Sequence, residues 1–390
     1  MPRSFKLFLL VVFFQYATQN LFFVATAAFL ANSDNAMMSM GNLLLIAMIP
    51  FFLSGFFLGP RFDRFSVRQQ LSFIKILRLV SFSFVAIGLF LKLSPSFLLY
   101  SNVFAADLGF FLFLSTASRV SKDFSVSSAK KTESAIVLLT QLGMVAGALL
   151  SSFALTNLSL KGIFLIAAVF ELSSLLVSQW IRVDAKTVVD ILQPRKDFLE
   201  AFKAVSRTPK AMAYLFPFIL VLPMLQVFNL FVAPWTESTF HDSGQVLAYI
   251  SAGCAAGACC GSLLLIKWTR LRESQWLPIS PFLIAIAVAG LFFSQNTSVI
   301  IAFSMLLGIG FSGSRIAANS ALIEVTPKNR MNEVSIIGLM MSILCSAFLV
   351  LALRHIPVTK VSLSFSVLAL IAISQMIVLI SNRKKLCHID

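Results

Sequence analysis

The sequence predicts an all-α integral membrane protein with twelve transmembrane helices, and three features lead to this fold class. Of the 390 residues, 58% are hydrophobic. Only 12% are charged, whereas a soluble domain has about 25% charged residues. The apolar residues also gather into runs of about 20, the length that crosses roughly 30 Å of hydrocarbon. This composition excludes an ordinary soluble domain and a disordered chain.

Twelve apolar runs account for most of the chain. Five of the ranges given below contain no charged residue, and the others carry charges at an end or inside the apolar run. We expect helices near residues 8–30, 40–60, 73–92, 97–119, 134–156, 160–182, 211–234, 244–267, 276–294, 298–323, 334–354 and 359–381. The segments between them are short, which leaves no separate soluble domain.

The longest predicted loop divides the helices into two groups of six. It covers residues 183–210 and separates an N-terminal half, 1–182, from a C-terminal half, 211–390. Residues 198–205 place their apolar side chains on one helical face, so we expect a short interfacial helix within this linker. Faint similarity between the polar positions of the two groups predicts two pseudo-symmetric halves.

The basic residues predict the topology. Lys and Arg outnumber Asp and Glu by 31 to 16, and most of them lie between the apolar runs. The positive-inside rule then predicts cytoplasmic N- and C-termini. In this orientation, all Lys and Arg residues are expected at or near the cytoplasmic side, except Lys92, Lys161, Arg354 and Lys360. This expectation includes Lys75 and Arg78. The net charge of +15 therefore indicates topology and contact with anionic membrane lipids, and no nucleic-acid partner.

The loop after the second predicted helix carries a motif. It reads Gly59-Pro60-Arg61-Phe62-Asp63-Arg64, and Arg68 follows four residues later. Asp63 can lie against a helix N-terminus and pair with Arg64 or Arg68 in one conformation only. We therefore predict a cytoplasmic gate formed by Gly59, Asp63, Arg64 and Arg68. The alternative is an ordinary positive-inside loop, in which Arg residues are expected anyway.

This Gly-x-x-x-Asp-Arg pattern resembles the loop 2–3 signature of the major facilitator superfamily. The twelve spans, the two halves and the basic central loop extend the resemblance over the whole chain. It implies a secondary transporter in a bacterial inner membrane, working as a monomer by alternating access around a midplane site. It also implies that the first, fourth, seventh and tenth helices line the central cavity.

Narrower resemblances suggest two substrate classes. The segments 202–209 and 322–330 resemble enterobactin-exporter-like members, which implies an antiporter that performs proton-coupled efflux of a siderophore- or drug-like compound. The segment from Gln19 to Thr26 resembles bacterial lysophospholipid transporters, which implies movement of lysophospholipid between leaflets. Those transporters have Asp where this chain has Gln19. The substrate therefore stays open at this point.

The cavity-lining helices carry most of the polar intramembrane side chains. Such amides need partners, so they favour either a wet cavity or a helix–helix interface. The candidate substrate-binding residues are Gln15, Gln19, Asn20, Asn102, Gln226, Asn229, Arg315 and Asn319. For each amide, helix–helix contact is an equal alternative. Arg315 either contacts the substrate or extends its charge toward the aqueous edge.

Two acidic residues are candidates for proton coupling. Asp107 lies near the middle of the fourth predicted helix, where an ionised Asp costs about 2.5–3.5 kcal/mol. A carboxyl in such a place is either protonated or paired, so we expect Asp107 to carry the proton. The alternative is a structural role, either in an ion pair or as a neutral hydrogen-bond donor. Glu171, midway along the sixth helix, is either a second proton site or the partner of a neighbouring polar group.

The sequence contains no pattern typical of an enzyme. The Cys and His residues have no metal-ligand or disulfide spacing, and no phosphate-binding loop or nucleophile motif occurs. We expect no metal and no cofactor. The expected partners are a small-molecule substrate, protons and membrane lipids. A membrane-embedded enzyme or scaffold would need a cluster of catalytic groups, and nucleotide exchange would need several cavity cations where only Arg315 is available.

Overall fold

The predicted twelve-helix membrane fold is confirmed. The computed structural model describes residues 3–54, 62, 65–124, 129–181, 209–241, 243–267, 273–325 and 331–381. The secondary structure of these residues consists of helices and turns, without strands. In this part of the chain, 11 helices are long and apolar enough to cross a membrane, and a further apolar segment, Ile337–Leu353, is shorter.

The chain divides into two compact units. Unit 1 comprises Met1–Ile191 and Phe240–Ala252, and unit 2 comprises Leu192–Thr239 and Gly253–Asp390. Unit 1 contains α1 (Arg3–Ala31), α2 (Ala36–Leu53), α4 (Val67–Phe90), α5 (Pro95–Phe124), α6 (Ala129–Asn157) and α7 (Leu160–Ser178). Unit 2 contains most of α9 (Pro209–Phe240) and of α10 (Ser243–Lys267), with α11 (Glu273–Phe293), α12 (Thr297–Val325), α13 (Met331–Leu353), the short 3₁₀ helix η3 (Val358–Lys360) and α14 (Val361–Ser381).

Some sequence predictions fall outside the described residues. These include nearly all of the expected linker, 183–210, and three members of the expected gate, Gly59, Asp63 and Arg64. The halves 1–182 and 211–390 stay a prediction as well. The helix positions themselves agree with the expected spans to within a few residues at most ends.

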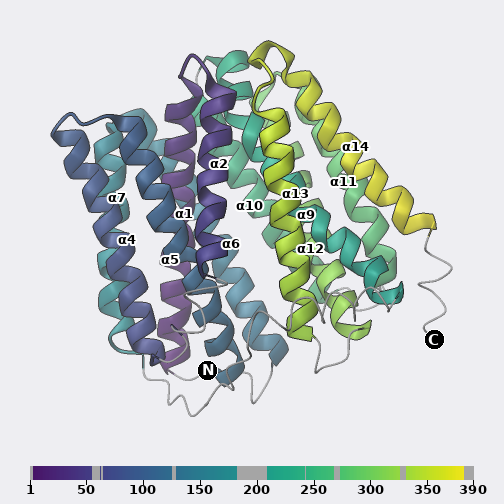
Figure 1. Ribbon diagram of the computed structural model, residues 1–390, viewed down its shortest axis with the longest axis horizontal. Helices are drawn as coiled ribbons and strands as arrows, with labels where there is room; N and C mark the ends of the chain where they lie inside the picture. The colour runs from purple at the N-terminus through teal and green to yellow at the C-terminus, as the bar shows by residue number, and fades with distance from the viewer. Residues whose placement is uncertain are drawn as a thin grey trace. The chain divides into compact units, whose positions relative to one another are not determined.

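Within unit 1, α1 packs along α6 and α7, and α4 packs against α5 and α7 (Figure 1). The contact between α1 and α6 depends on glycine. A Cβ atom at Gly147 would lie 2.2 Å from the backbone oxygen of Ala17, so only glycine permits this approach. The tight contact brings α1 into the middle of the polar side chains described below.

Within unit 2, α11 packs against α12 and α14 (Figure 1). The helices α10 and α12 meet as closely as α1 and α6 do, since a Cβ at Gly257 would lie 1.9 Å from the backbone oxygen of Met305. In α9, Pro223 has no N–H to donate to the carbonyl of Ile219. The Ser342 hydroxyl donates to that oxygen instead, at 2.7 Å, and so ties α13 to α9.

The start of α4 corrects one sequence prediction. Ser66 and Gln69 form a capping box, so α4 begins at Val67 and not near residue 73. Lys75 and Arg78 therefore follow the first residue of the helix by 8 and 11 positions. At 1.5 Å per residue, they lie about 12 and 17 Å along its axis. Both side chains are 0% exposed, so they lie inside unit 1 and not at its edge as expected.

Candidate functional site

In the part of unit 1 that the structure describes, four charged side chains are buried. Lys75 and Arg78 come from α4, Glu171 from α7 and Asp107 from α5, and Asp107 is the most exposed of them at 8%. The helix α1 adds uncharged polar side chains between them. Since each charge is costly in a low-dielectric interior, the arrangement of hydrogen bonds decides how each is stabilised.

Glu171 is neutralised by both cations. Its Oε2 lies 3.1 Å from Lys75 Nζ, and its Oε1 lies 2.7 Å from Arg78 Nε. The Thr18 hydroxyl of α1 also donates to Oε1, at 2.6 Å. Three donors on one carboxylate are the geometry that a buried ion pair needs if it is not to destabilise the fold. The structure therefore pairs Glu171 with α4, and a role as a second proton site stays a prediction.

Arg78 connects this ion pair to α1 and α5. Its Nη1 donates to Gln19 Oε1 at 2.8 Å and to the backbone oxygen of Ala106 at 3.0 Å. Its Nη2 donates to the Thr18 hydroxyl at 2.9 Å. A Cβ at Gly109 would lie 2.9 Å from Arg78 Cγ, so the absence of a side chain there makes room for the arginine.

The side chain of Gln19 links Asp107 to Arg78. The amide Nε2 of Gln19 donates to Asp107 Oδ1 at 2.7 Å, while its Oε1 accepts from Arg78. These two bonds fix the orientation of the amide, because the nitrogen faces the acid and the oxygen faces the cation. In the described residues, no cation lies within ion-pair distance of Asp107. The two buried acids therefore differ: one has two cations and the other has an amide.

Three further candidate residues join neighbouring helices. Gln15 accepts a hydrogen bond from Lys75 Nζ, and Asn20 Nδ2 donates to the backbone oxygen of Met144 at 2.7 Å. Asn102 Oδ1 accepts from the Ser81 hydroxyl at 2.6 Å. These bonds link α1 to α4, α1 to α6, and α4 to α5. Whether these amides also contact a substrate stays a prediction.

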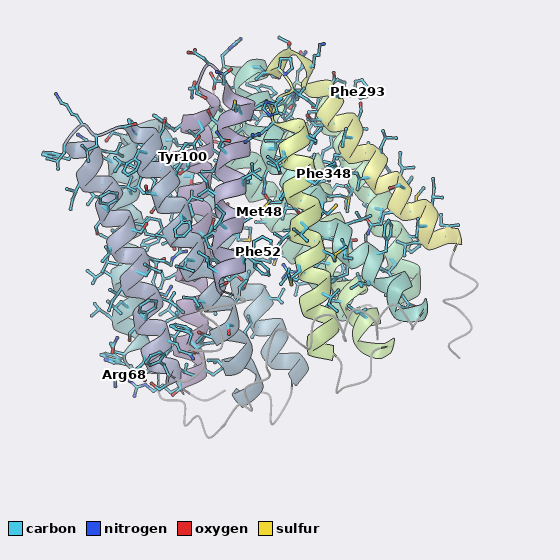
Figure 2. All side chains as sticks on the ribbon, viewed as in Figure 1. Met48, Phe52, Arg68, Tyr100, Phe293 and Phe348 are labelled. Carbon is cyan, nitrogen blue, oxygen red and sulfur yellow. The ribbon has the colours of Figure 1, made fainter. Side chains whose placement is uncertain are left out.

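The remaining candidates are more exposed. In unit 2, Gln226 and Asn229 are half-buried on α9, and Arg315 and Asn319 are exposed on α12. In unit 1, Arg68 lies exposed near the start of α4 (Figure 2). Its Nε and Nη2 both donate to Gln179 Oε1, each at 3.1 Å.

The sequence reasoning missed Lys75 and Arg78. Two signals pointed to them. They are three residues apart, so they share one face of a helix, and Glu171 is a mid-helix acid that needs a cation. The capping box before Val67 would have moved both cations away from the helix end.

Comparisons with known proteins agree with this architecture. The family model of the Major Facilitator Superfamily matches residues 8–352. Among solved structures, the nucleoside transporter NupG has a TM-score of 0.73 at 14% identity, covering 97% of this chain and 99% of that chain. A bacterial homologue of the iron transporter ferroportin, in an inward-facing state, has a TM-score of 0.72 at 12% identity, with 98% of both chains covered. A D-xylose-proton symporter has a TM-score of 0.70 at 13% identity, with 96% of both chains covered. No curated protein sequence matches the chain.

Proposed function

The chain belongs to the major facilitator superfamily, and from this premise we propose that it moves a small organic molecule by proton-coupled alternating access. It is a multi-pass membrane transporter and not an enzyme. The observation that carries proton coupling is Asp107, a buried carboxyl that has one amide partner and, in the described residues, no cation.

Asp107 and Glu171 take different roles in this proposal. A buried carboxyl without a counterion is costly when ionised and is stabilised by binding a proton. Glu171 already has two counterions, so it fixes Lys75 and Arg78 in place. With Asp107 ionised, the four buried charges sum to zero, and with Asp107 protonated they sum to +1. Proton binding thus changes the charge of the interior of unit 1, and this difference between states is what coupling requires.

The Gln19 amide transmits this change. It donates to Asp107 and accepts from Arg78. A protonated Asp107 accepts the amide hydrogen bond less strongly than an ionised one, because bonds to charged groups are the stronger ones. Protonation of Asp107 thereby affects Arg78, which bonds to Gln19 and pairs with Glu171 between α4 and α7.

For substrate and direction we propose efflux of a siderophore- or drug-like compound across a bacterial inner membrane. The support is the resemblance of segments 202–209 and 322–330 to exporters. The second candidate is lysophospholipid transport between leaflets. One observation favours it: Gln19 stands where the lysophospholipid transporters have Asp, and the Asp107 carboxylate lies 2.7 Å from the Gln19 amide. This chain therefore has a carboxylate next to the position at which those transporters have theirs, although it belongs to α5 and not to α1.

Reconstitution into liposomes tests the proposal. Purified protein would be given an imposed pH gradient and three probes: a catecholate siderophore, ethidium, and fluorescent lysophosphatidylethanolamine. We expect gradient-driven transport of the siderophore or of ethidium, and a loss of at least about tenfold in the Asp107→Asn variant. The matched control is Asp34→Asn, the same substitution at an exposed residue between α1 and α2.

Two outcomes would contradict the proposal. Normal gradient-driven transport by Asp107→Asn would exclude this residue as the proton carrier. Movement of lysophosphatidylethanolamine alone, unchanged by collapse of the gradient, would favour the second candidate.

A further inference from the structure

A hollow lies at one end of unit 1, apart from the buried charges. Its volume is about 580 Å³, and it is lined by Arg3, Ser4, Arg68, Gln179 and Trp180. These residues come from the first turns of α1 and α4 and from the segment directly after α7. Figure 2 labels Arg68 at this end of α4.

Neither arginine in this hollow has a counterion among the described residues. The Arg68 guanidinium is held by the neutral Oε1 of Gln179, and Gln179 Nε2 in turn donates to the Ser72 hydroxyl at 2.8 Å. The guanidinium is thereby positioned without losing its charge. Neither Arg3 nor Arg68 makes an ion pair with a described residue, and the described lining residues comprise two cations and no acid.

The helix termini add to the positive potential. Both α1 and α4 begin beside the hollow, and a helix N-terminus carries a partial positive charge. Acidic residues often offset this charge in the first turn, but neither helix has one there. Two guanidinium groups and two helix N-termini therefore point to an anionic ligand, and the planar guanidinium suits phosphate in particular.

The position along the helices indicates a lipid. The apolar span of α4 begins at Val67 and that of α7 ends at Ser178, so the hollow lies beside the ends of two apolar spans. Trp180, which is 68% exposed, is a residue type enriched at membrane–water interfaces. Phe73 and Leu176, at 52% and 61% exposed, lie on the adjoining turns of α4 and α7 and offer apolar surface for acyl chains.

We propose that this hollow binds the phosphate of an anionic glycerophospholipid headgroup, with Arg3 and Arg68 as the phosphate ligands and Trp180 against the glycerol region. The site uses neither Asp107 nor any of the other three buried charged residues. It gives unit 1 a specific lipid contact in addition to the general attraction of basic loops to anionic membranes.

Native mass spectrometry of the full chain tests this site. Phosphatidylglycerol and phosphatidylcholine with the same acyl chains would be titrated against the wild type and the Arg3→Gln/Arg68→Gln double variant. We expect the double variant to bind phosphatidylglycerol about tenfold more weakly and phosphatidylcholine unchanged, because each cation near the surface contributes to anionic lipid binding. The matched control is Lys92→Gln/Lys161→Gln, which removes two exposed cations from the opposite ends of α4 and α7.

The outcomes separate the possible ligands. Retention of phosphatidylglycerol by the control but not by the double variant supports the site. Equal affinity in the wild type and the double variant would overturn it. A third arm adds soluble glycerol phosphate: if it displaces phosphatidylglycerol at equal concentration, the hollow is a site for free phosphate compounds and the lipid assignment is wrong. All substituted residues are exposed, and size-exclusion chromatography checks that each variant remains folded.

Discussion

The two units bury different kinds of polar side chain. In the described part of unit 1, four charged residues are buried, and they belong to α4, α5 and α7. In the described part of unit 2, the buried polar side chains are hydroxyls and one amide, Gln375, and none is charged. Many of those hydroxyls are satisfied within their own helix, as when Ser304 donates to the oxygen of Ile300 at 2.8 Å.

This difference separates two ways of holding membrane helices together. Both units bring helix pairs close through glycine, at Gly147 in unit 1 and at Gly257 in unit 2. Among the described residues, only unit 1 adds a network of charges, and this network joins four helices. A change in protonation or in a counterion will therefore act on unit 1, while unit 2 responds chiefly to changes in packing. The following predictions test this contrast, beginning with the largest expected effect.

Glu171→Gln is expected to destabilise the protein most. The variant leaves Lys75 and Arg78 buried without their anion, and breaking a buried pair in this way costs about 3–5 kcal/mol. Thermal unfolding of the purified protein would measure it. Glu237→Gln in unit 2, at a half-buried glutamate without a described ion pair, is the matched control. If Glu171→Gln unfolded at the wild-type temperature, the charge network would not be what holds unit 1 together.

Gln19→Leu is expected to cost about 1.5–3 kcal/mol. It removes the acceptor of one Arg78 hydrogen bond and the donor to Asp107, both to groups that can be charged. Its unfolding temperature should fall between those of Glu171→Gln and the wild type. The transport assay should show weakened dependence on the pH gradient. A variant with lower stability but unchanged coupling would show that the amide is only structural.

Gly257→Ala is expected to cost about 1–3 kcal/mol, because the added methyl group would press on the backbone of Met305. Gly147→Ala should cost a similar amount in unit 1. Gly162→Ala is the control, since its nearest neighbour is a Leu158 side-chain atom at 3.3 Å. Thermal unfolding compares all three. A tolerated Gly257→Ala would mean that close helix contact is not the main source of stability in unit 2.

Gln226→Leu is expected to have the smallest effect on stability, below about 1 kcal/mol. The buried Oε1 of Gln226 has no hydrogen-bond partner among the described residues, so an apolar side chain of similar size loses little there. This variant is also the unit 2 counterpart of Gln19→Leu. A large loss of stability would reveal a polar contact in unit 2 comparable to those of unit 1.

Much of the fold followed from local sequence features. The apolar runs located all twelve helices because a membrane span is a property of about 20 consecutive residues. Asp107 and Glu171 were recognisable as unusual because each lies inside such a run. The partners of Glu171 were not predictable in the same way, because they depend on α4 packing against α7. That contact joins residues 93 and 96 positions apart.

The start of α4 depends on a short polar signal before the apolar run. The apolar run predicts a helix from about residue 73, whereas the spacing of Ser66 and Gln69 is that of a capping box, which begins the helix at Val67. An error of six residues in the helix start placed two central cations at the membrane edge. The hydrogen bond between Gln19 and Asp107 could not be predicted from the sequence either, because it depends on how α1 and α5 are rotated about their axes.

The distances along the chain between these charges also set an order of events during synthesis. Lys75 and Arg78 leave the ribosome first, Asp107 follows within the next helix, and Glu171 emerges 93 residues after Arg78. Until α7 has been made, Lys75 and Arg78 lack the carboxylate with which both pair in the folded unit. A chain that ended before α7 would therefore contain both cations of this network without Glu171.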